Sequence, residues 1–133
     1  MPDQQTSPAI VCDLTSAPDT GDERVAEYAR FFHAAFVSRE RTDDRVTWRL
    51  RADTGIEAWA RDLAARENAC CAFMTHTVTV VGEHVVWQAT TIDDPTARGV
   101  LDLYYDLPQL SNAEPETLWE RFESTGVAIV VPD

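Results

Sequence analysis

The stretch RENACCAFMTH, residues 66–76, gathers the side chains of this sequence that are best suited to chemistry. It holds a carboxylate at Glu67, adjacent thiols at Cys70 and Cys71, and an imidazole at His76. Thiolates prefer soft metal ions, and an imidazole nitrogen is a further ligand for such ions. A carboxylate or a thiol can also act as acid, base or nucleophile. This stretch is therefore the candidate functional site.

The periodicity of the preceding helix turns Glu67 toward the core. The apolar residues of a predicted helix ending near Asn68 share one face: Ile56, Trp59, Ala60 and Leu63. Glu67 falls within that stripe, and Cys70 and Cys71 flank it if the helical geometry continues for one more turn. A carboxylate on an apolar face is unfavourable unless it is paired, metal-bound or neutral. A neutral Glu67 would suit proton transfer, whereas a salt bridge to Arg49 or Arg51 is the structural alternative.

His76 and Cys12 are the further candidate donors. Alternate residues of a strand share a face, which places His76 on the more apolar side of the strand that follows the cysteines. Cys12 lies in the short apolar run AIVC and completes a three-sulfur site if this run pairs near the helix end. The structural alternatives are core packing of the cysteines as small hydrophobic side chains and a histidine that is simply satisfied in the core. Adjacent cysteines also lack the C-x-x-C spacing of common zinc and redox motifs.

Composition and charge restrict the class of protein. The 133 residues suffice for one domain, and the formal net charge is −12. All eleven basic residues are arginines and they are dispersed, which argues against binding of nucleic acid or of an anionic membrane surface. No apolar run approaches the roughly 20 residues of a membrane span, and the N-terminus does not resemble a secretory signal. We therefore predict a cytoplasmic protein whose thiols stay reduced.

Caps and apolar repeats predict the secondary structure. TGDE (20–23) and TGIE (54–57) are capping boxes that start two helices, and Asp94 with Pro95 starts a third that Pro108 stops. The first helix has its predicted apolar face at Val25, Tyr28, Ala29, Phe32 and Phe36. Alternating residues predict a strand within 44–52, a hairpin around residues 81–83 and a last strand within GVAIVVP, after a short helix within SNAEPETLWERFES.

From residue 45 the predicted order is β-α-β-β-α-(α)-β, which resembles a ferredoxin-like split βαβ unit. The predicted fold class is therefore α+β, with a ferredoxin-like antiparallel sheet and an extra N-terminal helix. Residues 1–18 are predicted to form a flexible arm or edge strand, and residues 19–133 a single domain. The open edges of such a sheet favour a homodimer.

The site residues resemble a known sequence pattern. LAARENACCAF, followed by a Thr/Val hairpin and DDPTARGVLD, looks like a family of small uncharacterised actinobacterial proteins with a Glu-x-x-Cys-Cys motif. A similar Glu-x-x-Cys-Cys-Pro-Phe segment occurs in domains associated with heavy-metal-responsive regulators. Here the motif is carried by Glu67, Cys70, Cys71 and Phe73, with Ala72 in place of the proline, and the resemblance covers roughly residues 9–108. The resemblance implies a thiophilic metal or metalloid ligand and no particular reaction.

Three functional hypotheses follow. In the leading one, Cys70 and Cys71 bind a soft metal ion of the Zn, Cu or Hg class, Glu67 is a ligand or proton acceptor, and His76 or Cys12 is a third donor. In the second, the protein is an enzyme of specialised metabolism that binds a small molecule in an apolar pocket, with Glu67 as acid/base and Cys70 or Cys71 as nucleophile. In the third, it is a structural or partner-binding module with a packed core.

Overall fold

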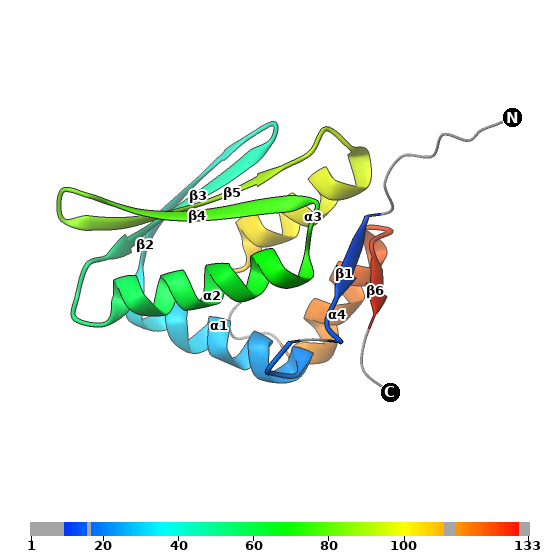
Figure 1. Ribbon diagram of the computed structural model, residues 1–133, viewed down its shortest axis with the longest axis horizontal. Coiled ribbons are helices and arrows are strands. Elements are labelled where there is room, and N and C mark those ends of the chain that lie inside the picture. Colours follow the sequence, from blue (N-terminus) through cyan, green and yellow to red (C-terminus); the bar gives the residue numbers. More distant parts are fainter. Residues whose placement is uncertain (1–9, 16, 111–113, 131–133) are drawn as a thin grey trace, which may run out of the picture.

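The computed structural model describes residues 10–15, 17–110 and 114–130, which form a mixed α+β structure (Figure 1). The elements in chain order are β1 (Val11–Asp13), α1 (Gly21–Ala35), β2 (Phe36–Thr42), β3 (Arg45–Arg51), α2 (Ile56–Cys70), β4 (Met74–Val81), β5 (His84–Thr91), α3 (Pro95–Asp106), α4 (Pro115–Ser124) and β6 (Ala128–Val130). The predicted α+β class is confirmed.

The main sheet has four strands in the order β2-β3-β5-β4, and every neighbouring pair is antiparallel. β1 and β6 form a separate parallel pair beside α4, at the end of the molecule where α2 ends (Figure 1). α1 and α2 lie below the sheet in this view, and α2 packs along β4. The hairpin predicted around residues 81–83 is confirmed as the turn between β4 and β5.

The structure does not confirm a ferredoxin-like sheet. β3 and β4 both pair with β5, so they are parallel to each other and lie on either side of it. The edge beside β3 is taken by β2, a strand that the sequence did not predict, while β6 lies outside the main sheet. The sequence FVSRERT of β2 lacks an alternating apolar pattern. An edge strand with charged side chains buries too little of either face to produce such a pattern.

The helix starts are predicted correctly in two of three cases. Thr20 and Glu23 form the capping box of α1, and the Asp94 side chain caps α3 with Pro95 in the first turn. The second capping box is wrong. α2 instead begins after Gly55, whose φ of 88° lies in the left-handed region that favours glycine, and no side chain caps the helix there.

The buried face of α1 also differs from the prediction. Phe36 belongs to β2, because α1 ends at Ala35. The buried residues of the helix are Arg24, Tyr28, Phe31, Phe32 and Ala35. Within this set, residues 24, 28, 31 and 35 follow the spacing of one helical face. An arginine therefore occupies the apolar stripe of α1, which matters for the site.

An aromatic cluster fills the core between the sheet and the helices. Trp48 on β3 and Trp87 on β5 are opposite each other in the sheet, fully buried, with ring centroids 4.9 Å apart. Tyr28 and Phe32 of α1 pack on them from the helical layer. Within the described residues, no helix is both long and apolar enough to cross a membrane.

Candidate functional site

The site lies at the junction between α2 and β4. α2 ends at Cys70, and the backbone N–H of Cys71 donates to the Glu67 carbonyl at 2.9 Å. The Asn68 side chain then joins the helix to the strand, because its amide donates to the His76 carbonyl at 2.9 Å and its oxygen accepts from the His76 N–H at 2.8 Å. These bonds connect the end of α2 to β4.

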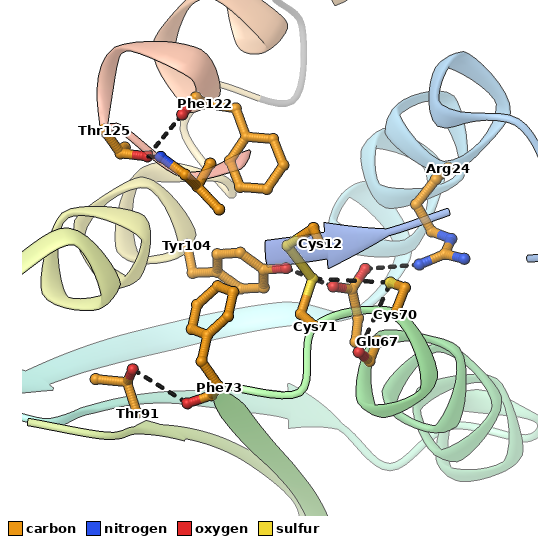
Figure 2. The surroundings of a disulfide bond; sticks show 11 residues. Cys12, Arg24, Glu67, Cys70, Cys71, Phe73, Thr91, Tyr104, Phe122 and Thr125 are labelled. Atoms are coloured by element: carbon orange, nitrogen blue, oxygen red, sulfur yellow. Dashed lines mark hydrogen bonds and ion pairs between the residues drawn. A yellow bond between two sulfur atoms is a disulfide. The ribbon is translucent and has the colours of Figure 1, made fainter. Parts of the chain in front are cut away.

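The three cysteines converge at this junction. Cys12 and Cys71 form an isolated bridge between β1 and the end of α2, with Cα atoms 4.4 Å apart, and their sulfurs are joined in a disulfide (Figure 2). The prediction that the thiols stay reduced is wrong for this pair. The cause is the pairing of the AIVC run with the helix end, which the sequence allowed but could not establish. Cys70 is the free thiol, with its Sγ 3.7 Å from that of Cys71.

Glu67 is buried, with an exposed fraction of 4%, and it is paired. Arg24 donates to its Oε2 at 2.8 Å, and the Tyr104 hydroxyl donates to its Oε1. Figure 2 shows the carboxylate between these two residues, with Cys70 beside it. The sequence correctly turned Glu67 inward, but the structural alternative of a salt bridge to Arg49 or Arg51 is wrong. The real partner comes from α1.

Arg24 extends the ion pair into a network. Its Nε and Nη2 donate to Asp19 at 2.6 and 2.8 Å, so one guanidinium bridges two carboxylates. Arg66 on α2 binds the same Asp19 at 3.0 Å and also Glu27 at 2.7 Å. Burial by itself would lower the pKa of Arg24, but the hydrogen bonds and charges of Asp19 and Glu67 outweigh it and raise the pKa. The network holds α1 against α2 beside the cysteines.

Sequence reasoning missed the two partners of Glu67. Arg24 could have been found from the sequence, because it lies on the same face of α1 as Tyr28 and Phe31. Glu67 likewise lies on the apolar face of α2. Two opposite charges, each on the apolar face of its own helix, predict an interhelical ion pair. Tyr104 was predicted only as part of the buried face of α3. Its contact with Glu67 joins residues 37 positions apart, which no local pattern reports.

His76 is buried as predicted, with an exposed fraction of 3%. Its Nδ1 accepts a hydrogen bond from Trp87 Nε1 at 3.0 Å, and its Nε2 has no partner among the described residues. Burial lowers the pKa of His76, against an opposing effect of the Glu67 charge. The donor atoms that lie within 4.8 Å of one another are those of Glu67, Cys70 and Cys71, without His76 or Cys12. Within the described residues, the predicted convergence of the carboxylate, the three cysteines and the histidine on one site is therefore only partial.

The environment of Cys70 favours the neutral thiol. Burial, with a smaller contribution from the Glu67 charge, raises the pKa of Cys70 to about 11. A reactive cysteine nucleophile needs the opposite shift. At neutral pH this thiol is therefore protonated, and it becomes a strong ligand or nucleophile only when something displaces its proton.

An apolar cavity of about 90 Å³ opens beside these groups. The apolar part of its wall comes mainly from α1, α3, α4 and the segment after β1: Leu14, Val25, Leu103, Leu107, Leu118 and Phe122. Arg24, Tyr28, Glu67, Cys70 and Tyr104 also line the cavity, although they expose little polar surface to it. Cys70, the free cysteine, therefore lines the cavity.

No protein-family model, curated protein or solved structure matches this chain.

Proposed function

We propose that this is a thiol-site protein whose cysteine cluster, when reduced, binds a soft metal ion. The observation that carries the proposal is the position of the Cys71 sulfur, which is bonded to that of Cys12 and lies 3.7 Å from that of Cys70. Reduction of this disulfide would therefore give Cys71 a free thiol next to that of Cys70, with the Cys12 thiol beside Cys71. Clustered thiolates select soft ions such as Cu⁺, Zn²⁺ or Hg²⁺.

The sulfur atoms carry the proposed site, with Glu67 as a neighbour. Glu67 already accepts hydrogen bonds from Arg24 and Tyr104, so its oxygens are engaged. Arg24 lies close enough to lower the pKa of Cys70, although burial outweighs this effect. The Glu-x-x-Cys-Cys resemblance supports the same class of ligand.

The enzyme hypothesis is less well supported. Cys71 is engaged in the disulfide, and the pKa of Cys70 is raised rather than lowered. Neither sulfur has the properties of an activated nucleophile. The carboxylate of Glu67 is held in an ion pair with Arg24, so it is not free to act as a base at the thiol.

Native mass spectrometry of the reduced and the oxidised protein tests the proposal. After exposure to Zn²⁺, Cu⁺ or Hg²⁺ and removal of the excess, we expect one ion per reduced chain and none on the chain with the Cys12–Cys71 disulfide. Ligand thiols lose their protons on binding, so uptake should strengthen as the pH rises from 6 to 8.

Variants identify the ligands in the same experiment. Cys70→Ser/Cys71→Ser should lose the ion, and Cys12→Ser should bind it more weakly. Glu67→Gln should retain it, because the sulfurs are unchanged. Circular dichroism checks that each variant is folded. Equal loading of the double variant and the wild type would refute the proposal and leave the packed-module hypothesis.

A further inference from the structure

β1, α4 and β6 form a unit beside the main sheet, here called the outer unit (residues 10–14 and 115–130). β1 and β6 are a two-stranded parallel sheet of their own. Two more backbone hydrogen bonds extend this pair: the Leu14 N–H donates to the Val130 carbonyl at 2.7 Å, and the Ala128 N–H donates to the Ile10 carbonyl at 2.9 Å. Figure 1 shows the three elements together at one end of the molecule. The outer unit is therefore held together from within, although its strands are distant in sequence.

The apolar cavity lies between the outer unit and the rest of the protein. Part of its wall comes from the outer unit: Leu14, Leu118, Trp119 and Phe122. α1, α2 and α3 supply most of the remaining wall, and almost all of the lining surface is apolar. Atoms that line a cavity lack packing contacts on that side. The packing between the outer unit and these helices is therefore incomplete, and their separation would expose apolar surface to water.

The polar contacts of α4 with the neighbouring helices are exposed. Among the described residues, Trp119 Nε1 donates to Asp22 of α1 at 3.0 Å, and Arg121 pairs with Asp106 of α3 at 3.1 Å. Exposed ion pairs contribute little to stability, because water screens them. The buried Leu118 adds apolar contact. Without the disulfide, the outer unit is therefore attached mainly by apolar packing that the cavity interrupts.

The disulfide supplies the strong attachment. It joins Cys12 of β1 to Cys71, directly after the end of α2 (Figure 2). β1 and β6 have three residues each, and two short strands alone are at best marginally stable in water. Pairing within the outer unit therefore cannot fix its position against α2, whereas the covalent bond does.

We propose that the Cys12–Cys71 disulfide is a redox switch: when a dithiol reduces it, the outer unit separates from the helices and the apolar cavity opens to water. In this step the S–S bond of the protein breaks, and its sulfurs take up two electrons and two protons as thiols. The dithiol supplies both and is oxidised to its own disulfide. Cys12 and Cys71 are only 1% and 2% exposed, so the reductant attacks during transient opening of the outer unit. The proposal is independent of the metal site, since it needs no ion.

Amide hydrogen exchange followed by NMR tests the proposal on the full-length protein with a chelator, with and without dithiothreitol. The reporters are the Leu14 and Ala128 amides of the outer unit and the amides of β5, which lies between two strands of the main sheet. In the oxidised protein we expect both sets to be protected. After reduction, the outer-unit amides should exchange within about tenfold of the rate of an unstructured peptide, and the β5 amides at least about a hundredfold more slowly than that.

Two results of this experiment would overturn the proposal. Outer-unit amides that exchange equally in both redox states would show that the disulfide does not control their opening. Loss of protection in β5 to the same extent would show that reduction unfolds the whole protein, with no separate movement of the outer unit.

An apolar fluorescent dye reports on the cavity in the same samples. Anilinonaphthalene sulfonate binds exposed apolar surface, so its fluorescence should rise several-fold on reduction while the far-ultraviolet circular dichroism keeps its shape. Unchanged dye fluorescence would mean that the cavity stays closed, which contradicts the proposal.

Two matched variants identify the sulfurs responsible. Cys12→Ser cannot form the disulfide and should behave as the reduced wild type in both conditions. Cys70→Ser makes the same substitution at the free thiol, keeps the disulfide and should respond to dithiothreitol as the wild type does. Protected outer-unit amides in Cys12→Ser, or loss of the response in Cys70→Ser, would refute the assignment. If Cys12→Ser fails to fold, the wild type in its two redox states still decides the outcome.

Discussion

Reduction of the Cys12–Cys71 disulfide should destabilise the protein strongly. The bond joins residues 59 positions apart, so it restricts the unfolded chain through a long loop. The chain-entropy relation gives about 4 kcal/mol of stabilisation for a loop of this length. Reduction also frees β1 from the end of α2, where the one isolated bridge of the described residues joins Cys12 to Cys71.

Urea unfolding with and without a phosphine reductant measures this effect. With a slope of about 2 kcal/mol per molar urea, the midpoint should fall by roughly 2 M on reduction. Cys70→Ser keeps the disulfide and should show the same fall. Cys12→Ser cannot form it and should unfold at one midpoint in both conditions.

Peptide mapping identifies the bond directly. Since the chain has arginine but no lysine, trypsin releases Cys12 within residues 1–24 and the other two cysteines within residues 67–98. Without reduction these two peptides should remain joined, with one alkylated cysteine, Cys70. Unlinked peptides together with an unchanged urea midpoint on reduction would refute the reasoning.

Three further predictions concern the buried titratable groups. Glu67→Gln should destabilise the protein by about 3 kcal/mol in urea unfolding, because it leaves the Arg24 charge buried with Asp19 as its main partner; a loss below the error of the method would contradict the ion pair. Cys70 should be alkylated by iodoacetamide at a rate that rises about tenfold per pH unit up to pH 10, because its pKa is raised to about 11 and the thiolate is the reactive form; a plateau below pH 9 would show a normal or lowered pKa. Folding lowers the pKa of His76 from its usual value of 6.5. As the pH falls through 6.5, the unfolded chain therefore takes up a proton at His76 that the folded chain does not. Stability should therefore decrease as the pH falls below 6.5, by up to about 1.4 kcal/mol per unit, and His76→Gln should remove this contribution from the urea midpoints.

Local patterns in the sequence were sufficient to predict several features of the structure. Helical spacing turned Glu67 inward and strand alternation turned His76 inward, because side-chain direction is set by backbone periodicity. The caps at Thr20 and Asp94 followed from the same kind of local chemistry. β2 and the start of α2 at Gly55 were missed, since an edge strand and a left-handed glycine leave no apolar repeat.

Tertiary structure alone decided what meets at the site. The sequence determined that a carboxylate and two thiols end one helix on its core face. Only the packing of α1, β1 and α3 against that helix brought Arg24, Cys12 and Tyr104 to them. These partners are distant in sequence, and their meeting depends on how whole elements pack. That packing changed the site from a group of free ligands into a paired carboxylate, a disulfide and one thiol beside an apolar cavity.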